Sequence, residues 1–266
     1  MGLELNNKTP GLFTHSNRAE TGITSIEGTG NIRSATYVVS QDGKGDFDDI
    51  QEAIDALPPG TDGGGLIYVK NGVYDKRLYL NGRPNIRIIG SGSSTIIKDT
   101  SGGNEVILCF NSTKNIFENL RIERENGQDG IKLSSSFFAR IINCFIKDAD
   151  DAYGLILSSY GIVKSTYINC SATSQGIRII GVANIITDNI IQLEDTNGST
   201  YGIMMQNGSS YDRNIISNNY IYDNTNGDGI NAGSDNNLIN GNIFYDCNVA
   251  VDDNGFGNVV TDNVNA

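Results

Sequence analysis

Four nine-residue stretches of the sequence share one pattern, and this pattern decides the fold. Residues 184–192 read NIITDNIIQ, residues 214–222 read NIISNNYIY, residues 237–245 read NLINGNIFY and residues 258–266 read NVVTDNVNA. In each stretch an Asn precedes a short apolar run, and a second Asn follows five positions after the first. Short strands separated by Asn, Asp and Gly turns cannot each bury a face alone, so we expect the repeats to stack.

A second repeat, nearer the N-terminus, begins with Gly and then alternates apolar and other residues. Its members are Gly130-Ile131-Lys132-Leu133, Gly154-Leu155-Ile156-Leu157, Gly176-Ile177-Arg178-Ile179, Gly202-Ile203-Met204-Met205 and Gly229-Ile230-Asn231-Ala232. Two or three short strands per period of roughly 22 residues predict an all-β protein, a right-handed parallel β-helix. About nine coils from Leu66 to the end, each about 4.8 Å high, would give a rod of about 40 Å.

The repeated Asn residues have a structural role in such a stack. Identical amides on successive coils can satisfy one another's hydrogen-bond donors and acceptors. We therefore expect a ladder of side chains along the rod rather than ligand-binding groups, formed by Asn184, Asn214, Asn237 and Asn258.

The segment DFDDIQEAIDALPPG, residues 46–60, has apolar residues at helical spacing and predicts an amphipathic helix over 48–57. Asp48 and Gln51 resemble a capping box, and the Pro58-Pro59-Gly60 sequence ends the helix. This helix would cover the open N-terminal edge of the coil stack against strand addition.

The chain divides into two parts on composition. Residues 1–35 are polar without a sustained period, which predicts an extended N-terminal arm or linker, and residues 36–266 form the predicted β-helix domain. No cap follows residues 263–266, so the last edge would pair with another chain, as in a homotrimer, or the sequence is a fragment.

Composition excludes several classes of function. With 19 Lys and Arg against 31 Asp and Glu, the formal charge is -12, which argues against a nucleic-acid partner. No apolar run is long enough for a membrane span, and the start of the sequence does not resemble a signal peptide. His15 is the only histidine, and the four cysteines lack the spacing of a zinc site, so we predict no metal ligands of that kind.

The stretches VVSQDGKGDFDDIQEAIDALP, IYVKNGVY and IIGSGSSTII resemble the pectin-lyase-like superfamily of β-helix proteins, and locally the opening segment of pectinesterases. The resemblance covers residues 36–100 and beyond them only the repeat pattern. It implies the fold, a cap and a substrate groove along one strand face.

The pectinesterase motifs do not carry over residue by residue. The family's Gly-x-Tyr-x-Glu element falls on residues 72–76, where Lys76 stands at the Glu position. The strands expected to carry Gln and the two catalytic Asp residues fall near Gln128, Tyr153 and Gln175, and only Gln128 is kept in kind. These replacements at the motif positions disfavour pectin demethylation.

The Gly-led strands predict where a groove could lie. If side chains alternate, Ile131 and Leu133 face the core. One outward column is then formed by Lys132, Ile156, Arg178, Met204 and Asn231. Acidic residues precede these strands in the sequence and are expected in turns, at Glu125, Asp129, Asp148, Asp150, Asp151, Glu194, Asp195, Asp223 and Asp228.

Two carboxylate pairs follow as hypotheses. Asp151 and Glu194 would lie two coils apart, which suits an acid and a base around a water molecule, and Asp129 and Asp151 would lie one coil apart. Asp150 is a further catalytic candidate beside Asp151. An alternative is that these acids are solvated turn residues, because Asp favours turns for backbone reasons.

Five residues are candidates for substrate binding: Gln128, Lys132, Tyr153, Arg178 and Tyr201. The two cations suit an anionic or hydroxyl-rich partner, and the two tyrosines could stack on sugar rings. Lys132 and Arg178 could instead be salt-bridged to neighbouring acids. No cofactor is predicted, although Ca²⁺ could be held by residues 148–151 through oxygen ligands.

Three hypotheses for function remain open. The first is a carbohydrate-active β-helix that binds and cleaves an extracellular polysaccharide, with a virion-associated tailspike depolymerase as one setting. The second is a non-catalytic adhesive or structural rod. The third is a polysaccharide lyase or uronate epimerase.

Overall fold

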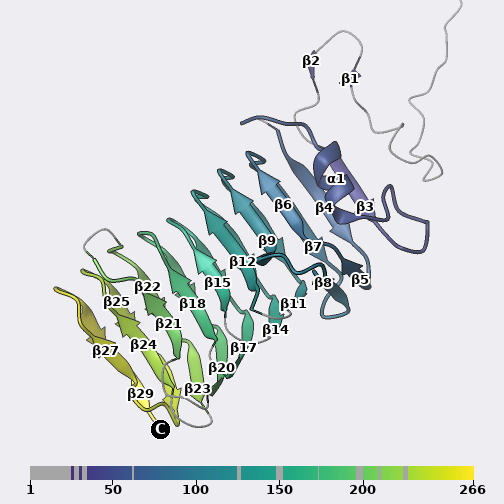
Figure 1. Cartoon of the computed structure of the whole chain (residues 1–266). Coiled ribbons are helices and arrows are strands. Elements are labelled where there is room, and N and C mark those ends of the chain that lie inside the picture. The colour runs from purple at the N-terminus through teal and green to yellow at the C-terminus, as the bar shows by residue number, and fades with distance from the viewer. Residues whose placement is uncertain are drawn as a thin grey trace, which may run out of the picture.

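The chain folds into a parallel β-helix that begins with strand β3 and helix α1 and winds to the C-terminus (Figure 1). The structure is a computed structural model that describes residues 25–26, 30–31, 35–61, 63–124, 127–147, 152–172, 174–195, 200–208, 211–223 and 227–266. Outside the helix, β1 (Ser25–Ile26) and β2 (Gly30–Asn31) form a separate antiparallel pair. Most of the predicted arm, residues 1–35, lies outside the described residues.

Three parallel sheets form the sides of the helix, and each coil contributes one strand to each. Sheet 1 has ten strands: β3 (Ala35–Val39), β4 (Gly65–Val69), β7 (Ile86–Gly90), β10 (Ile116–Glu118), β13 (Arg140–Ile142), β16 (Ile162–Lys164), β19 (Ile185–Thr187), β22 (Ile215–Ser217), β25 (Leu238–Asn240) and β28 (Val259–Thr261).

Sheet 2 has nine strands: β5 (Gly72–Asp75), β8 (Thr95–Lys98), β11 (Arg121–Glu123), β14 (Phe145–Lys147), β17 (Tyr167–Ala172), β20 (Ile190–Asp195), β23 (Tyr220–Asp223), β26 (Ile243–Tyr245) and β29 (Val264–Asn265). Sheet 3 has eight: β6 (Leu78–Asn81), β9 (Glu105–Phe110), β12 (Asp129–Ser134), β15 (Tyr153–Leu157), β18 (Gln175–Ile179), β21 (Tyr201–Met205), β24 (Asp228–Ala232) and β27 (Val251–Asp253). Within the described chain, β4 to β27 make eight full coils and β28–β29 begin a ninth, which confirms the predicted fold.

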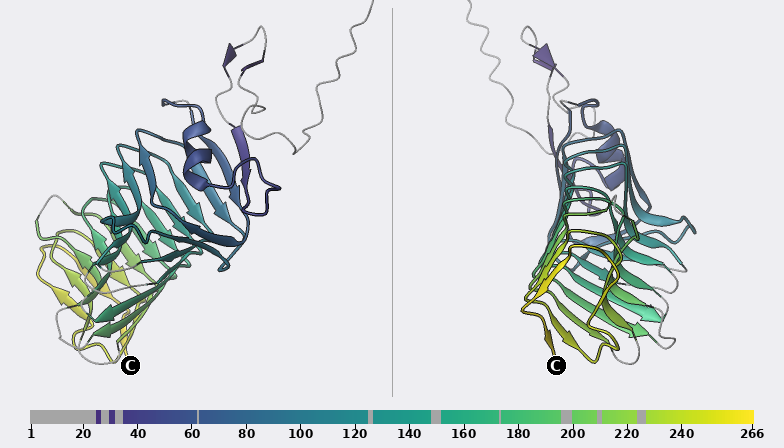
Figure 2. Two further views of the ribbon diagram at one scale, coloured as in Figure 1. Left: turned by 45° about the vertical axis from the view of Figure 1, so that its right-hand side comes forward. Right: turned by 90° about the vertical axis from the view of Figure 1, so that its left-hand side faces the viewer.

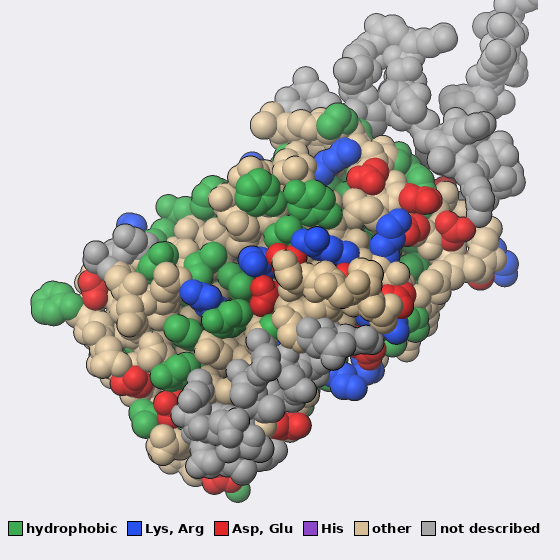
Figure 3. Space-filling model, in the orientation of Figure 1, with side chains coloured by type: hydrophobic (Ala, Val, Ile, Leu, Met, Phe, Trp, Pro, Cys, Tyr) green, Lys and Arg blue, Asp and Glu red, His purple; other side chains and the backbone are tan. Residues whose placement is uncertain are grey.

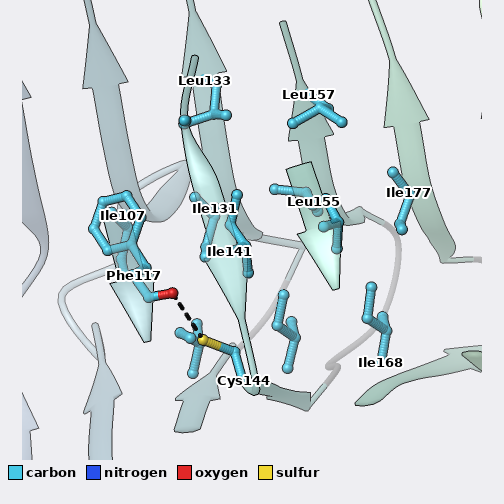
Figure 4. Close-up of a cluster of buried hydrophobic side chains, with 14 of the residues drawn as sticks. Ile107, Phe117, Ile131, Leu133, Ile141, Cys144, Leu155, Leu157, Ile168 and Ile177 are labelled. Atoms are coloured by element: carbon cyan, nitrogen blue, oxygen red, sulfur yellow. Dashed lines mark hydrogen bonds between the residues drawn. The ribbon is translucent and has the colours of Figure 1, made fainter. Parts of the chain in front are cut away.

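The core is a set of stacked aliphatic columns, one from each sheet. In sheet 3 the column contains Ile107, Ile131, Leu155 and Ile177, all fully buried and in register. Figure 4 shows these side chains pointing into the same interior as residues of the other two sheets. In the middle of the strands the side chains alternate, so a residue between two core positions, such as Lys132 between Ile131 and Leu133, lies on the outer face.

The repeated glycines of sheet 3 are needed because backbones and side chains approach closely at the corner with sheet 2. A Cβ added at Gly176 would lie 2.4 Å from the carbonyl oxygen of Gly202 and 2.8 Å from Cγ2 of Ile191. Gly130, Gly154, Gly202 and Gly229 are equally crowded. Glycine is thus required in this repeat because a side chain would not fit at the corner, and not because the backbone has a positive φ angle.

Replacement of Gly176 with Ala is expected to destabilise the protein by about 1–3 kcal/mol, because the added methyl group overpacks this corner. The measurement is the urea midpoint and slope of unfolding, followed by circular dichroism. Lys147→Ala on the exposed face of β14 serves as the control and should leave the midpoint nearly unchanged. An unchanged midpoint for Gly176→Ala would show that the corner has more room than its geometry indicates.

The predicted Asn ladder is present. Nδ2 of Asn184 donates to Oδ1 of Asn214, Asn214 donates to Asn237, and Asn237 donates to Asn258, each at 3.0 Å. A second ladder has the same geometry one strand further along each coil, through Asn189, Asn219, Asn242 and Asn263. Side-chain amides therefore form hydrogen bonds between successive coils, in one row before and one row after the strands of sheet 1.

The helix α1 (Ile50–Ala56) covers the N-terminal end of the coils, as the sequence predicts (Figure 2). The predicted capping box is wrong by one residue: Asp49 is the N-cap, and its side chain accepts a hydrogen bond from the Glu52 N–H at 3.0 Å. Gln51 instead bonds both backbone groups of Tyr79, at 2.8 and 3.2 Å. Gln51 thus satisfies part of the edge strand β6.

The opposite edge carries no such cover among residues 227–266. Val260 is the register partner of the buried Ile239, yet it is 41% exposed. A homotrimer covering this edge stays a prediction. None of the helices in the described ranges is long and apolar enough to span a membrane.

Candidate functional site

The outer face of sheet 3 carries three of the charged residues that the sequence analysis names, Asp129, Lys132 and Arg178. The predicted column is in register, because each residue is the partner of the next: Lys132, Ile156, Arg178, Met204 and Asn231. Ile156 within it is buried, at 5% exposure. Figure 3 shows Lys and Arg side chains in a row along this face, with acidic side chains beside them. We therefore take the outer face of sheet 3 as the candidate site.

Two carboxylates lie on adjacent coils at the beginning of this face. Glu105 starts β9 and Asp129 starts β12, and the two residues are register partners. Their side chains are only 6% and 12% exposed. Parallel strands are about 4.8 Å apart. This spacing is close to the distance between the two carboxyl groups of retaining glycosidases, in which one carboxylate is the nucleophile and the other carboxyl is the acid.

Two cations lie over the carboxylate pair. Nζ of Lys132 lies 3.4 Å from Oε1 of Glu105 and 3.6 Å from Oδ2 of Asp129. Arg77 forms a hydrogen-bonded ion pair with the other oxygen of Glu105. Both cationic side chains are more than a third exposed, so a ligand on this face would meet them before it reached the carboxylates.

The two carboxyl groups differ in environment. Burial raises the pKa of Asp129, and the charge of Glu105 adds to this effect. The Tyr153 N–H donates to Oδ1 of Asp129 at 3.1 Å and, with Lys132, partly opposes the shift. A carboxyl with a raised pKa is suited to donate a proton, whereas Glu105 contacts two cations that compensate its charge.

Further along the face, Tyr153 and Arg178 form a second cluster. Arg178 donates to the Tyr153 hydroxyl at 3.1 Å and to Oε1 of Gln206 at 3.1 Å, and its guanidinium lies 5.0 Å from the Tyr153 ring centroid. Tyr201 lies in the same register column as Tyr153 and is half-buried. The predicted substrate-binding residues Lys132, Tyr153, Arg178 and Tyr201 therefore share one sheet.

Other predicted site residues lie elsewhere. Glu194 is not in a turn before sheet 3: it belongs to β20 of sheet 2, where it accepts hydrogen bonds from Asn169 and Gln192 at 3.1 Å. The strand simply continues further than the sequence pattern indicated. Gln128 is buried, at 2% exposure, and is no surface group. Asp150 and Asp151, like the Ca²⁺ candidate segment 148–151, lie outside the described residues.

Sequence reasoning missed Glu105 as a partner for Asp129. The signal was present, because Glu105 precedes Val106-Ile107 as Asp129 precedes Gly130-Ile131. The Gly-led repeat was traced only from Gly130, since position 106 is Val. The described residues contain no group of three His, Cys, Asp or Glu side chains arranged to hold a metal ion.

The cysteines are inert fillers of the core in the described structure. Cys109, Cys144 and Cys170 are buried, and burial raises the pKa of each thiol to about 12. We expect these three thiols to resist a disulfide reagent such as Ellman's reagent in the native protein at neutral pH and to react fully in denaturant. Rapid labelling of any of them in native buffer would show that the coils open.

Comparison with known proteins agrees with this fold. A protein-family model described as Pectinesterase matches residues 36–118. Probable pectinesterase 30 of Arabidopsis thaliana is 33% identical over 84 residues, which is 31% of this chain and 17% of that protein. Probable pectinesterase/pectinesterase inhibitor 12 of the same plant is 28% identical over 204 residues, which is 66% of this chain and 37% of that protein. The matched part thus spans well under half of these curated relatives.

Solved structures give the same architecture. Pectin methylesterase from carrot superposes with a TM-score of 0.61 at 14% identity, covering 85% of this chain and 82% of that one. Pectin methylesterase PemA from Erwinia chrysanthemi gives a TM-score of 0.50 at 13% identity, covering 82% and 92%. At such identities the likeness shows the fold.

One expectation from the sequence is corrected by these comparisons. Pectin demethylation was disfavoured because the motif positions hold other residues. The family match over residues 36–118 and the pectinesterase relatives both point to the pectinesterase class, so that exclusion was wrong. The exclusion considered only the residues at the aligned motif positions. A carboxylate pair that it did not consider, Glu105 and Asp129, lies on β9 and β12. Over residues 36–118 the chain is similar to pectinesterases, and its fold is the parallel β-helix of the pectin methylesterase structures.

Proposed function

We propose that the protein is a carbohydrate-active enzyme that hydrolyses methyl esters of a pectin-like polyuronate on the outer face of sheet 3. The observation that carries the proposal is the Glu105–Asp129 pair, two carboxylates on adjacent coils under Lys132 and Arg77. The match of residues 36–118 to the pectinesterase model supports the same class.

The chemistry divides between the two carboxyl groups. An oxygen of Glu105 attacks the ester carbonyl carbon, and Lys132 stabilises the negative charge that develops on the carbonyl oxygen. Asp129 donates its proton to the methoxy oxygen as the C–O bond breaks, so methanol leaves. Water then attacks the Glu105 acyl intermediate and gives its proton to Asp129, which releases the uronate and restores both groups.

The test measures three products from one incubation with highly methyl-esterified pectin. The proposal predicts methanol without new reducing ends and without the absorbance of unsaturated uronates. New reducing ends would indicate a glycosidase, and unsaturated uronates would indicate a lyase. The absence of all three products with every pectin sample would indicate a non-catalytic rod. Each of these three results would overturn the esterase assignment. An extracellular or virion-associated location stays a prediction.

A further inference from the structure

Arg178 lies on the same outward column as Lys132, two coils further along the rod. Lys132 pairs with Ile156 in the next coil, and Ile156 pairs with Arg178 in the coil after that. Two coils span about 10 Å along the axis. A polymer that follows the sheet 3 face from the Glu105–Asp129 pair toward the C-terminus therefore passes over Arg178.

The Arg178 side chain is held in place before any ligand binds. One terminal nitrogen donates to the Tyr153 hydroxyl and the other to Oε1 of Gln206, both at 3.1 Å. The guanidinium also lies 5.0 Å from the Tyr153 ring centroid, within cation–π range. Because its partners fix this geometry, little side-chain entropy remains to be lost on binding an anion.

Arg178, like Arg83 and Arg140, forms no ion pair within the described residues, whereas several other arginines do. Arg77, Arg87 and Arg121 each form an ion pair with a Glu. In the part of the chain that the structure describes, no carboxylate lies within 4 Å of Arg178, although the protein carries a net charge of -12. Its Nε atom is buried and has no hydrogen-bond partner there. A half-buried guanidinium satisfied only by neutral groups is suited to an incoming carboxylate.

We propose that Arg178 is a subsite for the free carboxylate of a uronate unit, about two sugar units away from the ester that is held at Glu105 and Asp129. This inference rests on the proposed function for the position of the ester, and on the Arg178 contacts for the carboxylate. One sugar unit of an extended glycan is roughly as long as one coil is high, so alternate units meet alternate coils. The enzyme would therefore favour partly de-esterified over fully esterified polymer.

Binding of a fully de-esterified galacturonate hexamer, followed by isothermal titration calorimetry at low ionic strength, tests the subsite without catalysis. Arg178→Gln is expected to weaken binding about tenfold or more, since it removes a charge-assisted contact. Arg140→Gln, on the exposed outer face of β13 in sheet 1, is the matched control and should bind as the wild type does. Tyr153→Phe, which keeps the ring and removes the hydroxyl, should give a smaller loss.

Kinetics then separate this inference from the proposed function. With active enzyme, Arg178→Gln should raise KM for partly de-esterified pectin by a larger factor than KM for fully esterified pectin, so the preference between the two substrates should shrink. Hexamer binding that depends on Arg178 without methanol release by the wild type would sustain the carboxylate subsite and overturn the esterase. Three results would overturn the subsite. The wild type and Arg178→Gln could bind the hexamer with equal affinity, Arg140→Gln could lose as much affinity as Arg178→Gln, or the wild type could fail to bind the hexamer.

Discussion

Replacement of Asp129 with Asn is expected to lower the rate of methanol release by about 10²–10⁴-fold, the usual range for loss of a general acid–base group. Asn has the shape of Asp and can still accept the Tyr153 N–H bond, so the fold should be retained. Ionisation of Asp129 is opposed by burial, so its contribution to stability falls as pH rises through its raised pKa. The variant should therefore be at least as stable as the wild type at neutral pH.

The pH profile gives the sharper part of this test. If Asp129 acts as the acid, kcat/KM of the wild type declines as pH rises above the pKa of Asp129, and this decline disappears in the residual activity of Asp129→Asn. Glu105→Gln should be as inactive as Asp129→Asn. Glu194→Gln, on sheet 2, is the matched control and should keep full activity. Full activity in a folded Asp129→Asn variant would exclude this site.

Replacement of Asn214 with Asp is expected to cost about 3–5 kcal/mol in unfolding free energy, because it places an unpaired charge inside the ladder. Nδ2 of Asn214 donates to Oδ1 of Asn237 and to the Tyr211 carbonyl, and the residue is fully buried. A carboxylate there loses both donated bonds and faces two acceptor oxygens instead. Burial favours its protonated form, so the deficit should grow as pH rises above the ordinary range of Asp.

Guanidinium unfolding at several pH values measures this effect. The matched control is Asn218→Asp, the same chemical change four residues away at an exposed turn position. The equivalent turn residue of the preceding coil is Asp188, with φ of 57° against 56° for Asn218, so the turn accepts Asp. If the two variants lost similar amounts of unfolding free energy, the buried ladder position would be no more sensitive to a charge than the exposed turn position.

The repeats predicted the fold because each coil obeys the same local rules. Alternation fixed which residues of Gly130–Leu133 face the core, and the Asn spacing predicted the first ladder. The helix boundary was less certain from sequence, since Asp48 and Asp49 are both capable N-caps and only the packing of Ile50 and Ile54 selects Asp49. The reason for Gly at the sheet 3 corner required coordinates, because the clash involves a neighbouring coil.

The candidate site was predicted in part. The sequence placed Lys132 and Arg178 on one column, and it allowed either cation to be salt-bridged; Lys132 is, whereas Arg178 bonds Tyr153 and Gln206. Glu105 was missed because the repeat was recognised by its glycine. Position 106, which corresponds to Gly130, is Val, so the repeat was not followed back to β9. Variable loop lengths between coils also left the end of β20, and hence Glu194, undetermined.

The measurement that most directly tests the central proposal is a crystal structure of the Asp129→Asn variant bound to a methyl-esterified galacturonate hexamer. The account predicts that the hexamer lies along the outer face of sheet 3, with a methyl ester carbonyl beside Glu105 and Lys132 and a uronate unit over Arg178. A hexamer bound along the outer face of sheet 1 or sheet 2, away from Glu105, would contradict it.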